Sequence, residues 1–248
     1  MKRREDNIGF GDLRLIQDED SFCYGTDAVL LADMVCRSID ISEDMRICDL
    51  GCNTGIISLI LSAKCRADEI VGVEVQEQAF ELAKENALIN HLTKRLYFVC
   101  CNVKDIQVCD NGMLQKGSFD IVTTNPPYTE AGRGIISENK SKAIARHEIL
   151  ASLDDFFETA AFLLKDKGQL FMVHRPARIV DICESCRKFN LEPKTIRFVS
   201  GKPGELPNIL LIHFVKGGKP DLKWLSPISV RNEDGSFSKD ALSAYELY

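Results

Sequence analysis

Short apolar runs alternate along this chain with longer stretches in which apolar residues recur at helical spacing. The runs are continuous and rich in β-branched and aromatic residues, as in strands that are buried on both faces. They lie at 46–50, 70–75, 96–101, 119–124, 169–174, 195–200 and 209–215. Helical patterns lie between or before them, at 25–35, 55–64, 77–90 and 153–165. This alternation predicts a doubly wound α/β fold with a mostly parallel sheet and helices on both faces.

The flanking residues refine this prediction. The segment "GKPGELPN" between the last two runs is too short for a helix, so we expect a seven-stranded sheet whose last strand is antiparallel. Ser152 is the expected N-cap of one helix, and Thr26 or Asp27 that of the first helix. We expect a single domain over 1–248, in which 1–45 form an N-terminal extension with a helix and 216–248 form an irregular tail.

Composition and charge narrow the class of protein. The chain has 248 residues, of which 45% are hydrophobic and 27% charged, which is ordinary for a globular protein. No run approaches the ~18 consecutive apolar residues of a membrane span, and no apolar segment follows the basic N-terminus. We therefore expect a cytoplasmic protein. Its formal net charge of −6 disfavours non-specific binding of polyanions, so any nucleic-acid contact needs a local basic patch.

The 10 cysteines are scattered, and several lie inside apolar runs. Without an export signal, free and mostly buried thiols are expected. Cys183 and Cys186 form a C-x-x-C pair, but the chain has no second pair with matching spacing. The pair lies in a helical pattern, which favours packing over zinc or redox chemistry. We expect no metal.

The segment "DLGCNTG", residues 49–55, ends the first predicted strand and opens a helix. Ligands in such sheets bind beyond the carboxyl ends of the strands, and glycines there let the backbone approach them. Gly51 and Gly55 are four residues apart with Asn53 between them, so the G-x-G-x-x-G pattern of dinucleotide enzymes is absent. Asp49 instead favours a cationic ligand, and S-adenosylmethionine carries both a sulfonium and an amino group.

Polar residues also follow the second and third predicted strands. Glu74 lies about 20 residues after the glycine loop, where a carboxylate can accept both hydroxyls of a ribose. Asn102 or Asp105 could bind the edge of an adenine. Each carboxylate alone is better explained as a cap of the following helix, but three polar strand ends together favour a nucleoside cofactor.

The fourth predicted strand ends in Asn125-Pro126-Pro127-Tyr128. Prolines cannot continue a sheet, so the chain must turn here. The Asn125 side-chain oxygen and a proline carbonyl, held by the fixed φ of the Pro-Pro pair, could grip the two N–H groups of an exocyclic amine. Tyr128 offers a face on which a base could stack, worth ~1–3 kcal/mol. Alignment alone can supply ~7–11 kcal/mol of such a barrier, which explains why no Ser/His/Asp set is needed.

The Asn-Pro-Pro-Tyr segment resembles the catalytic motif of class I amino-methyltransferases. The blocks "YGTDAVLLADMV", "DLGCNTGIISLIL", "VGVEVQEQAFELAKENALIN", "IVTTNPPY", "ARHEI", "LLKDKGQLFMVHRPARI" and "EPKTIRFV" occur in the order found in the tRNA adenosine-N6 methyltransferases that act on valine tRNA. This resemblance covers residues from about 8 to 220. It implies a Rossmann-like fold, S-adenosylmethionine as cofactor, and as target the adenosine immediately 3′ of the anticodon in a tRNA partner.

The resemblance also implies roles for individual residues. The motif Asn125, Pro126, Pro127 and Tyr128 would be catalytic. The cofactor would be bound by Thr26, Asp49, Gly51, Asn53, Gly55, Glu74, Asn102, Val103, Asp105 and Asn125. Two of these depart from the family pattern: Asn53 replaces the usual middle glycine, and Asn102 stands where an aspartate is commoner. Basic residues are candidates for RNA contact: Arg133, Lys140, Lys142, Arg146 and Arg175.

Several alternatives stay open at this point. The same chemistry could act on a DNA adenine, a ribosomal guanine or a protein glutamine. Release-factor methyltransferases carry an added N-terminal helical domain, whereas only about 45 residues precede the first strand here. A non-catalytic cofactor-binding or RNA-binding protein and a nicotinamide enzyme are weaker readings. The patch that contains His147 could be a solvated loop, and His174 and His213 are expected to be core or rim histidines with satisfied hydrogen bonds.

Overall fold

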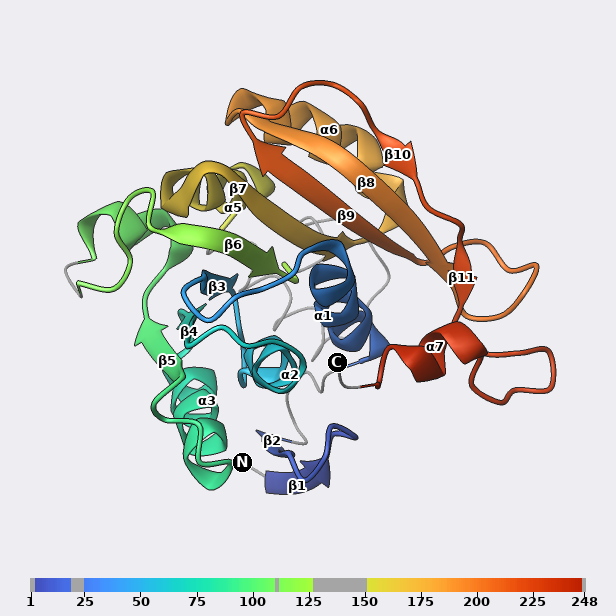
Figure 1. Ribbon diagram of the computed structural model, residues 1–248, viewed down its shortest axis with the longest axis horizontal. Helices are drawn as coiled ribbons and strands as arrows, with labels where there is room; N and C mark the ends of the chain where they lie inside the picture. The colour runs from blue at the N-terminus through green and yellow to red at the C-terminus, as the bar shows by residue number, and fades with distance from the viewer. Residues whose placement is uncertain (1–2, 19–24, 110–111, 127–150, 247–248) are drawn as a thin grey trace, which may run out of the picture.

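The computed structural model describes residues 3–18, 25–109, 112–126 and 151–246, and it confirms the α/β class. The long strands of the main sheet follow the order β5-β4-β3-β6-β7-β9-β8 (Figure 1). Their bounds are β3 Arg46–Leu50, β4 Glu69–Glu74, β5 Leu96–Cys100, β6 Phe119–Thr124, β7 Leu164–His174, β8 Leu191–Ser200 and β9 Ile209–Lys216. All seven predicted strands are present, and β7 and β8 begin several residues earlier than predicted.

The last long strand is antiparallel, as the short connection before it predicts. β9 pairs with β7 on one side and β8 on the other, antiparallel to both, whereas β3 to β7 pair in parallel. Among the described residues, two short strands extend the sheet beyond the predicted seven, β10 Lys223–Trp224 and β11 Ile228–Ser229, which both run parallel to β8.

Helices cover both faces of this sheet (Figure 1). One face carries α1 Thr26–Ser38, α2 Ile56–Lys64 and α3 Glu77–Ile89; the other carries α5 Leu153–Leu163, α6 Ile179–Lys188 and the 3₁₀ turn η1 Val103–Val108. A second 3₁₀ turn, η2 Pro176–Arg178, precedes α6. Successive strand residues point to opposite faces. Ile47 therefore joins the core under α1 and α2, while Cys48 joins the core under α5 and α6.

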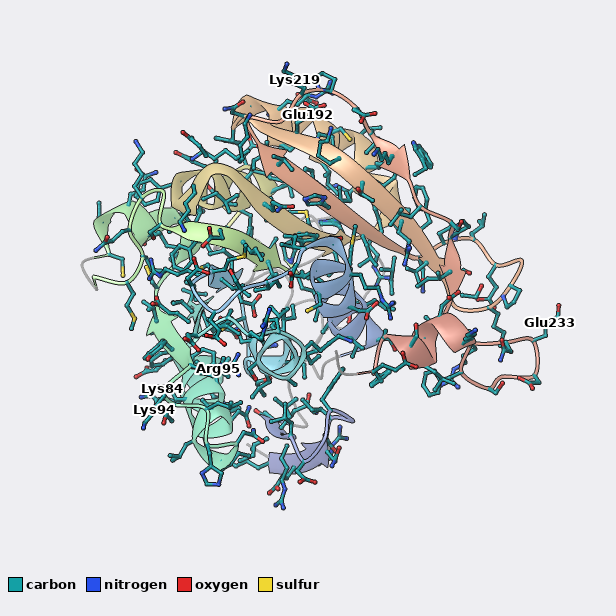
Figure 2. The ribbon with its side chains drawn as sticks, in the orientation of Figure 1. Lys84, Lys94, Arg95, Glu192, Lys219 and Glu233 are labelled. Carbon is teal, nitrogen blue, oxygen red and sulfur yellow. The ribbon has the colours of Figure 1, made fainter. Side chains whose placement is uncertain are left out.

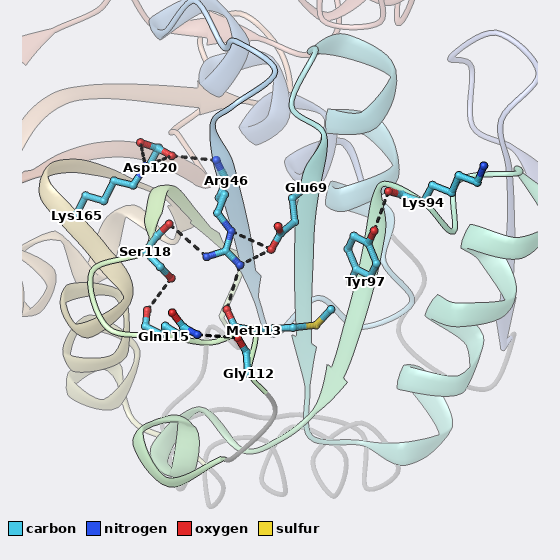
Figure 3. Close-up of polar contacts among 10 residues, drawn as sticks. All are labelled: Arg46, Glu69, Lys94, Tyr97, Gly112, Met113, Gln115, Ser118, Asp120 and Lys165. Atoms are coloured by element: carbon cyan, nitrogen blue, oxygen red, sulfur yellow. Dashed lines mark hydrogen bonds and ion pairs between the residues drawn. The ribbon is translucent and has the colours of Figure 1, made fainter.

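A polar cluster fixes the amino edge of the sheet (Figure 3). The Arg46 guanidinium donates to Glu69 and to the carbonyl of Met113, at 3.1 Å from the latter. The Arg46 backbone N–H donates to Asp120 at 2.9 Å, and Lys165 pairs with the same carboxylate at 2.8 Å. These bonds hold the amino ends of β3, β4, β6 and β7 together. They thereby help to fix how the carboxyl ends of the same strands line up at the opposite edge.

Two features of the N-terminal part differ from the expectation. Among the described residues, β1 Arg3–Asn7 and β2 Arg14–Asp18 form an antiparallel hairpin that the sequence pattern did not predict. Buried Asn86 holds it, accepting from the Ile16 N–H at 2.7 Å and donating to the Ile16 carbonyl. The N-cap of α1 is Gly25 in extended conformation, so the prediction of Thr26 or Asp27 as the cap was wrong.

Other local predictions are confirmed. Ser152 is the N-cap of α5, where it forms a reciprocal capping box with Asp155. The nine described cysteines are free thiols, and Cys183 and Cys186 lie on α6 as predicted. In the part of the chain that is described, no helix is both long and apolar enough to span a membrane.

The C-terminal segment, expected to be irregular, contains β10, β11 and α7 Lys239–Ser243, and a buried lysine ties it to the helices. The Lys64 side chain is fully buried, and its ammonium donates to Asp33 at 3.1 Å and to the carbonyls of Ala244 and Glu246 at 2.8 and 2.7 Å. Good hydrogen-bond geometry offsets the cost of burying this charge. Lys64 therefore couples the end of the chain to α1 and α2.

Lys64→Met should lower the free energy of unfolding by about 3 kcal/mol, because Asp33 and two carbonyls lose a buried donor. Urea denaturation measures this value. Lys84→Met is the matched control, since Lys84 is an exposed lysine paired with Glu81 on α3, and a change within about 0.5 kcal/mol is expected there (Figure 2). Equal stability of the two variants would contradict the role given to Lys64.

Candidate functional site

The glycine loop after β3 turns through three left-handed residues. Gly51 has φ +71°, Asn53 has φ 49° and Gly55 has φ +83°. Asn53 can stand where a glycine is usual because asparagine tolerates this region better than most residues. At Gly55 a side chain would meet the Phe98 ring at 3.0 Å, so both space and conformation require glycine there. The loop thus brings backbone close to the end of the sheet.

Glu74, at the end of β4, is buried and holds this loop. Its two carboxylate oxygens accept the backbone N–H groups of Asn53 and Gln76, each at 2.9 Å. Gln76 is the N-cap of α3, so Glu74 takes part in the helix start, as one reading of the sequence suggested. A carboxylate has about four acceptor sites, and the bond from the Gln76 side chain at 3.3 Å uses a third, so Glu74 retains limited capacity for a hydroxyl.

Asp49 is fully buried at the carboxyl end of β3. Its oxygens accept from the hydroxyls of Thr123 at 2.9 Å and Ser58 at 3.2 Å. Among the described residues it has no cationic partner. Burial raises the pKa of Asp49 to about 7, while the two hydroxyl bonds oppose the rise and nearby Glu74 adds to it. A carboxylate in this state would gain from a cationic ligand.

The end of β5 lies beside Glu74, since the Cys101 N–H donates to the Glu74 carbonyl at 3.0 Å. The Asn102 side chain accepts from the Lys104 N–H at 3.1 Å and caps η1. Val103 is buried, and Asp105 is exposed. The structure therefore places all three residues at one strand end, with Asn102 already engaged in capping.

Asn125 follows β6 and lies next to a residue whose role the sequence pattern missed. Its side-chain nitrogen donates to the Asp27 carboxylate at 3.4 Å, across 98 positions of sequence. Asp27 is buried in the first turn of α1, where it also accepts from the Ala28 N–H at 3.0 Å. The only sequence signal was its place in the block "YGTDAVLLA", where it was considered as a helix cap.

The remaining candidates divide between described and undescribed parts of the chain. Pro126 is buried directly after Asn125. The other motif residues and most of the basic patch lie outside the described residues: Pro127, Tyr128, Arg133, Lys140, Lys142, Arg146 and His147.

Thr26 and Arg175 line a cavity of about 400 Å³ that also includes Asp27. The cavity lies between the start of α1, the end of β7, the β8–β9 loop and the segment after β11. It is therefore next to Asn125. In the order of the strands it lies beyond β6, on the side opposite to β3 and the glycine loop.

The two histidines that interrupt apolar runs are buried. Burial lowers the pKa of each to about 4, so both are neutral near pH 7. His174 accepts the Arg175 N–H at 2.8 Å, as expected of a satisfied histidine. His213 stacks on Phe171 at 4.5 Å, but its Nε2 has no hydrogen-bond partner among the described residues, so that part of the prediction was wrong.

Comparison with known proteins agrees with this arrangement of a glycine loop and polar strand ends. The model of the "Methyltransferase small domain" family matches residues 20–180, which include the loop, Glu74 and Asn125. The chain belongs to this methyltransferase family. The sheet is accordingly the Rossmann-like sheet expected of a class I methyltransferase.

Relatives of this methyltransferase carry a common name. A tRNA1(Val) (adenine(37)-N6)-methyltransferase from Mannheimia succiniciproducens is 26% identical over 98% of this chain and 93% of its own length. Another, from Phocaeicola vulgatus, is 28% identical over 84% of this chain and 82% of its own length.

Solved structures of methyltransferases share the fold. A predicted O-methyltransferase from Agrobacterium tumefaciens is similar with a TM-score of 0.70 and 21% identity, over 90% of this chain and 98% of that one. TrmN from Thermus thermophilus gives a TM-score of 0.54 with 17% identity, over 76% of this chain and 48% of that one.

Asp49→Asn should alter how the stability of this methyltransferase depends on pH. As pH rises from about 4 to 7, the unfolded chain loses the Asp49 proton while the folded protein keeps it, because the folded pKa is about 7. The wild-type free energy of unfolding therefore loses up to about 4 kcal/mol from this group across that window. The variant lacks this loss, so its stability relative to wild type should rise with pH.

Urea denaturation across that pH range measures the difference. Asp44→Asn is the control, since a hydrogen bond from Ser42 lowers the pKa of the exposed Asp44, and its contribution has the opposite sign. Parallel stability curves for wild type and Asp49→Asn would show that Asp49 has no raised pKa.

Proposed function

We propose that this protein uses S-adenosylmethionine to methylate the exocyclic N6 amine of an adenosine in tRNA. The observation that carries the proposal is the Asn125 side chain at the end of β6, whose nitrogen faces the buried Asp27 carboxylate. A carboxylate without a proton only accepts hydrogen bonds, so the Asn125 oxygen faces the other way and can accept from an amine. Support for the cofactor, the chemistry and the substrate comes from different residues.

S-adenosylmethionine fits the residues at the ends of β3, β4 and β5. The buried Asp49 has two hydroxyl partners and no cation among the described residues, and this favours a ligand with positive charge. The glycine loop gives backbone access, and Glu74 lies where a ribose hydroxyl would reach it. Asn102, Val103 and Asp105 follow β5, which pairs with β4, and would bind the adenine of the cofactor. Solved structures of related fold include geranyl diphosphate methyltransferase in complex with this cofactor.

When bound, the cofactor supplies a methyl carbon made electrophilic by its positively charged sulfur. The Asn125 oxygen and the carbonyl of Pro126 would each accept one N–H of the target amine. These two bonds would turn the nitrogen lone pair out of conjugation with the ring and aim it at the methyl carbon. The residues at the ends of β3, β4 and β5 would hold the cofactor so that its methyl group could pass to this nitrogen, with the electron pair of the S–C bond left on sulfur. The nitrogen is then cationic and releases a proton, so a strong general base is not required.

The substrate is proposed from the relatives. They are named for adenine 37 of a valine tRNA, and the matches extend over most of this chain. A tRNA substrate also implies a cytoplasmic site of action. The same acceptor pair could serve a DNA adenine, a ribosomal guanine or a protein glutamine, which the assay below includes as separate substrates.

Asn125→Ala should lower kcat for methyl transfer to tRNA by about 10²–10³-fold, because the amine loses the acceptor that orients it. Transfer of labelled methyl to unmodified valine tRNA measures this, with DNA, ribosomal RNA and protein tested in parallel. Cofactor affinity measured by calorimetry separates this loss of alignment from any loss of cofactor binding, since the resemblance also assigns Asn125 to the cofactor. Asn7→Ala at the end of β1, where Asn7 accepts the Gly9 N–H, is the control and should keep wild-type kcat. Wild-type activity in Asn125→Ala would rule out the proposed chemistry.

Asp27→Asn should lower kcat by about tenfold with little change in KM for tRNA. An asparagine at this position can donate as well as accept, so the Asn125 amide is no longer held in one orientation. Single-turnover kinetics at saturating cofactor separates this effect from binding. A purely structural role for Asp27 would instead lower the melting temperature and leave kcat of the folded fraction unchanged.

A further inference from the structure

The cavity beside Asn125 contains three cationic side chains from separate segments. Arg175 follows β7, Lys202 lies in the β8–β9 loop and Arg231 follows β11. Two carboxylates, Asp27 and Glu205, also line the cavity. The three cations therefore exceed the carboxylates by one, in a chain whose net charge is −6. This cavity is a local exception to the acidic character of the protein.

Both carboxylates have partners of their own. Asp27 accepts from Asn125 at 3.4 Å, and Glu205 accepts from the Lys202 backbone N–H at 3.0 Å. The Lys202 ammonium, in contrast, has no hydrogen-bond or ion-pair partner among the described residues. Arg231 is held in place by a bond to the Gly235 carbonyl at 2.8 Å and by the Phe237 ring at 4.5 Å. Arg175 donates to the Asn208 carbonyl at 2.8 Å. The cavity therefore presents Lys202 and the positioned Arg231 to a ligand, and an anion is the ligand that fits.

The order of the strands gives the position of the cavity relative to Asn125, where the reaction is proposed to occur. Asn125 follows β6, in the middle of the sheet. The proposed cofactor residues that follow β3, β4 and β5 lie on one side of it, whereas Thr26, which the resemblance also assigns to the cofactor, lines the cavity. The cavity lies on the other side, at the ends of β7 and β8 and the start of β9. A target base that meets the cofactor at Asn125 therefore has the cavity on the side away from the cofactor, where the rest of its nucleotide can extend.

We propose that this cavity binds a backbone phosphate of the RNA adjacent to the target adenosine, with Lys202 and Arg231 as its main contacts and Arg175 beside them. The inference rests on the proposed function, because it assumes that a base occupies the Asn125 site. The occupant is proposed as a phosphate of a polynucleotide and not a free anion, because Asp27 lines the cavity and also contacts Asn125, where the target base would lie. Neutralisation of phosphates by such cations dominates the affinity of proteins for nucleic acids.

The test compares Lys202→Ala, Lys202→Glu and the double variant Lys202→Ala/Arg231→Gln with wild type. The matched control is Lys94→Ala: Lys94 is an exposed lysine just before β5, at the amino edge, and Figures 2 and 3 show it at the periphery with its ammonium pointing away from its neighbours. Binding of valine tRNA is measured by fluorescence anisotropy over a range of salt concentrations without turnover. The KM and kcat for methyl transfer and the affinity for S-adenosylmethionine are measured separately.

We expect Lys202→Ala to raise the Kd and KM for tRNA by about five- to tenfold, and Lys202→Glu to raise them further. Each cation removed should make the slope of log K against log salt less negative by about 0.7–0.9. Cofactor affinity and kcat at saturating tRNA should stay within about twofold of wild type. Lys202→Arg should restore binding, because it restores the charge.

Unchanged tRNA affinity and salt slope in the Lys202 and double variants would overturn this inference even if wild type methylates tRNA. Loss of tRNA binding in those variants without any methyl transfer by wild type would leave the cavity as an RNA site and overturn the proposed function. Absence of tRNA binding by wild type would overturn both. A preference of the cavity for an acidic peptide over RNA in competition would also contradict the inference.

Discussion

One hydrogen bond, from the Asn125 side chain to Asp27, sets the orientation of the group on which the proposed chemistry depends. A carboxamide has an acceptor at one end and a donor at the other, and only a fixed neighbour decides which end faces a ligand. Asp27 is buried on the first turn of α1, and α1 packs against β7 and β9. The N-terminal helix therefore contacts the proposed site, although 98 positions separate the two residues.

The order of the strands separates two groups of residues along the carboxyl edge of the sheet. Residues suited to a nucleoside cofactor follow β3, β4 and β5, and the cationic cavity lies beyond β7. The antiparallel β9 is the reason that the cavity exists at this edge. β9 begins where β8 ends, so the loop with Lys202 lies at the carboxyl edge. β11 runs parallel to β8, which brings Arg231 to the same place.

Two buried ionisable residues in this protein, Lys64 and Asp49, indicate different roles. Lys64 is surrounded by a carboxylate and two carbonyls, so its charge is compensated within the fold and joins the C-terminal segment to α1 and α2. Asp49 has hydroxyl and backbone hydrogen bonds but no cationic partner among the described residues, and burial raises its pKa to about 7. Perturbed groups of this kind are concentrated at functional sites. A buried charge that has partners of opposite charge within the fold indicates a structural role. A buried charge without such a partner indicates a place for a ligand.

Local patterns in the sequence determined most of the fold. Continuous apolar runs identified the seven long strands, and the spacer of 201–208 required an antiparallel end because it is too short to cross the sheet. The polar residues at strand ends could be assigned to one edge, since the carboxyl ends of parallel strands meet there. Ser152 could be read as a cap because capping is a contact between near neighbours.

Contacts between distant segments were decided only by the tertiary structure. β1 of the hairpin is polar and mostly exposed, β2 is only five residues long, and Asn86 of α3 holds the hairpin, so no local periodicity marked it. Asp27 beside Asn125, Lys64 beside the C-terminal carbonyls, and the cavity with Lys202 and Arg231 each join residues far apart in sequence. The sequence by itself determined which residues form strands and helices and which follow them at the reactive edge. The tertiary structure decides which of those residues come into contact and which charged side chains lie together, because packing brings separate elements side by side.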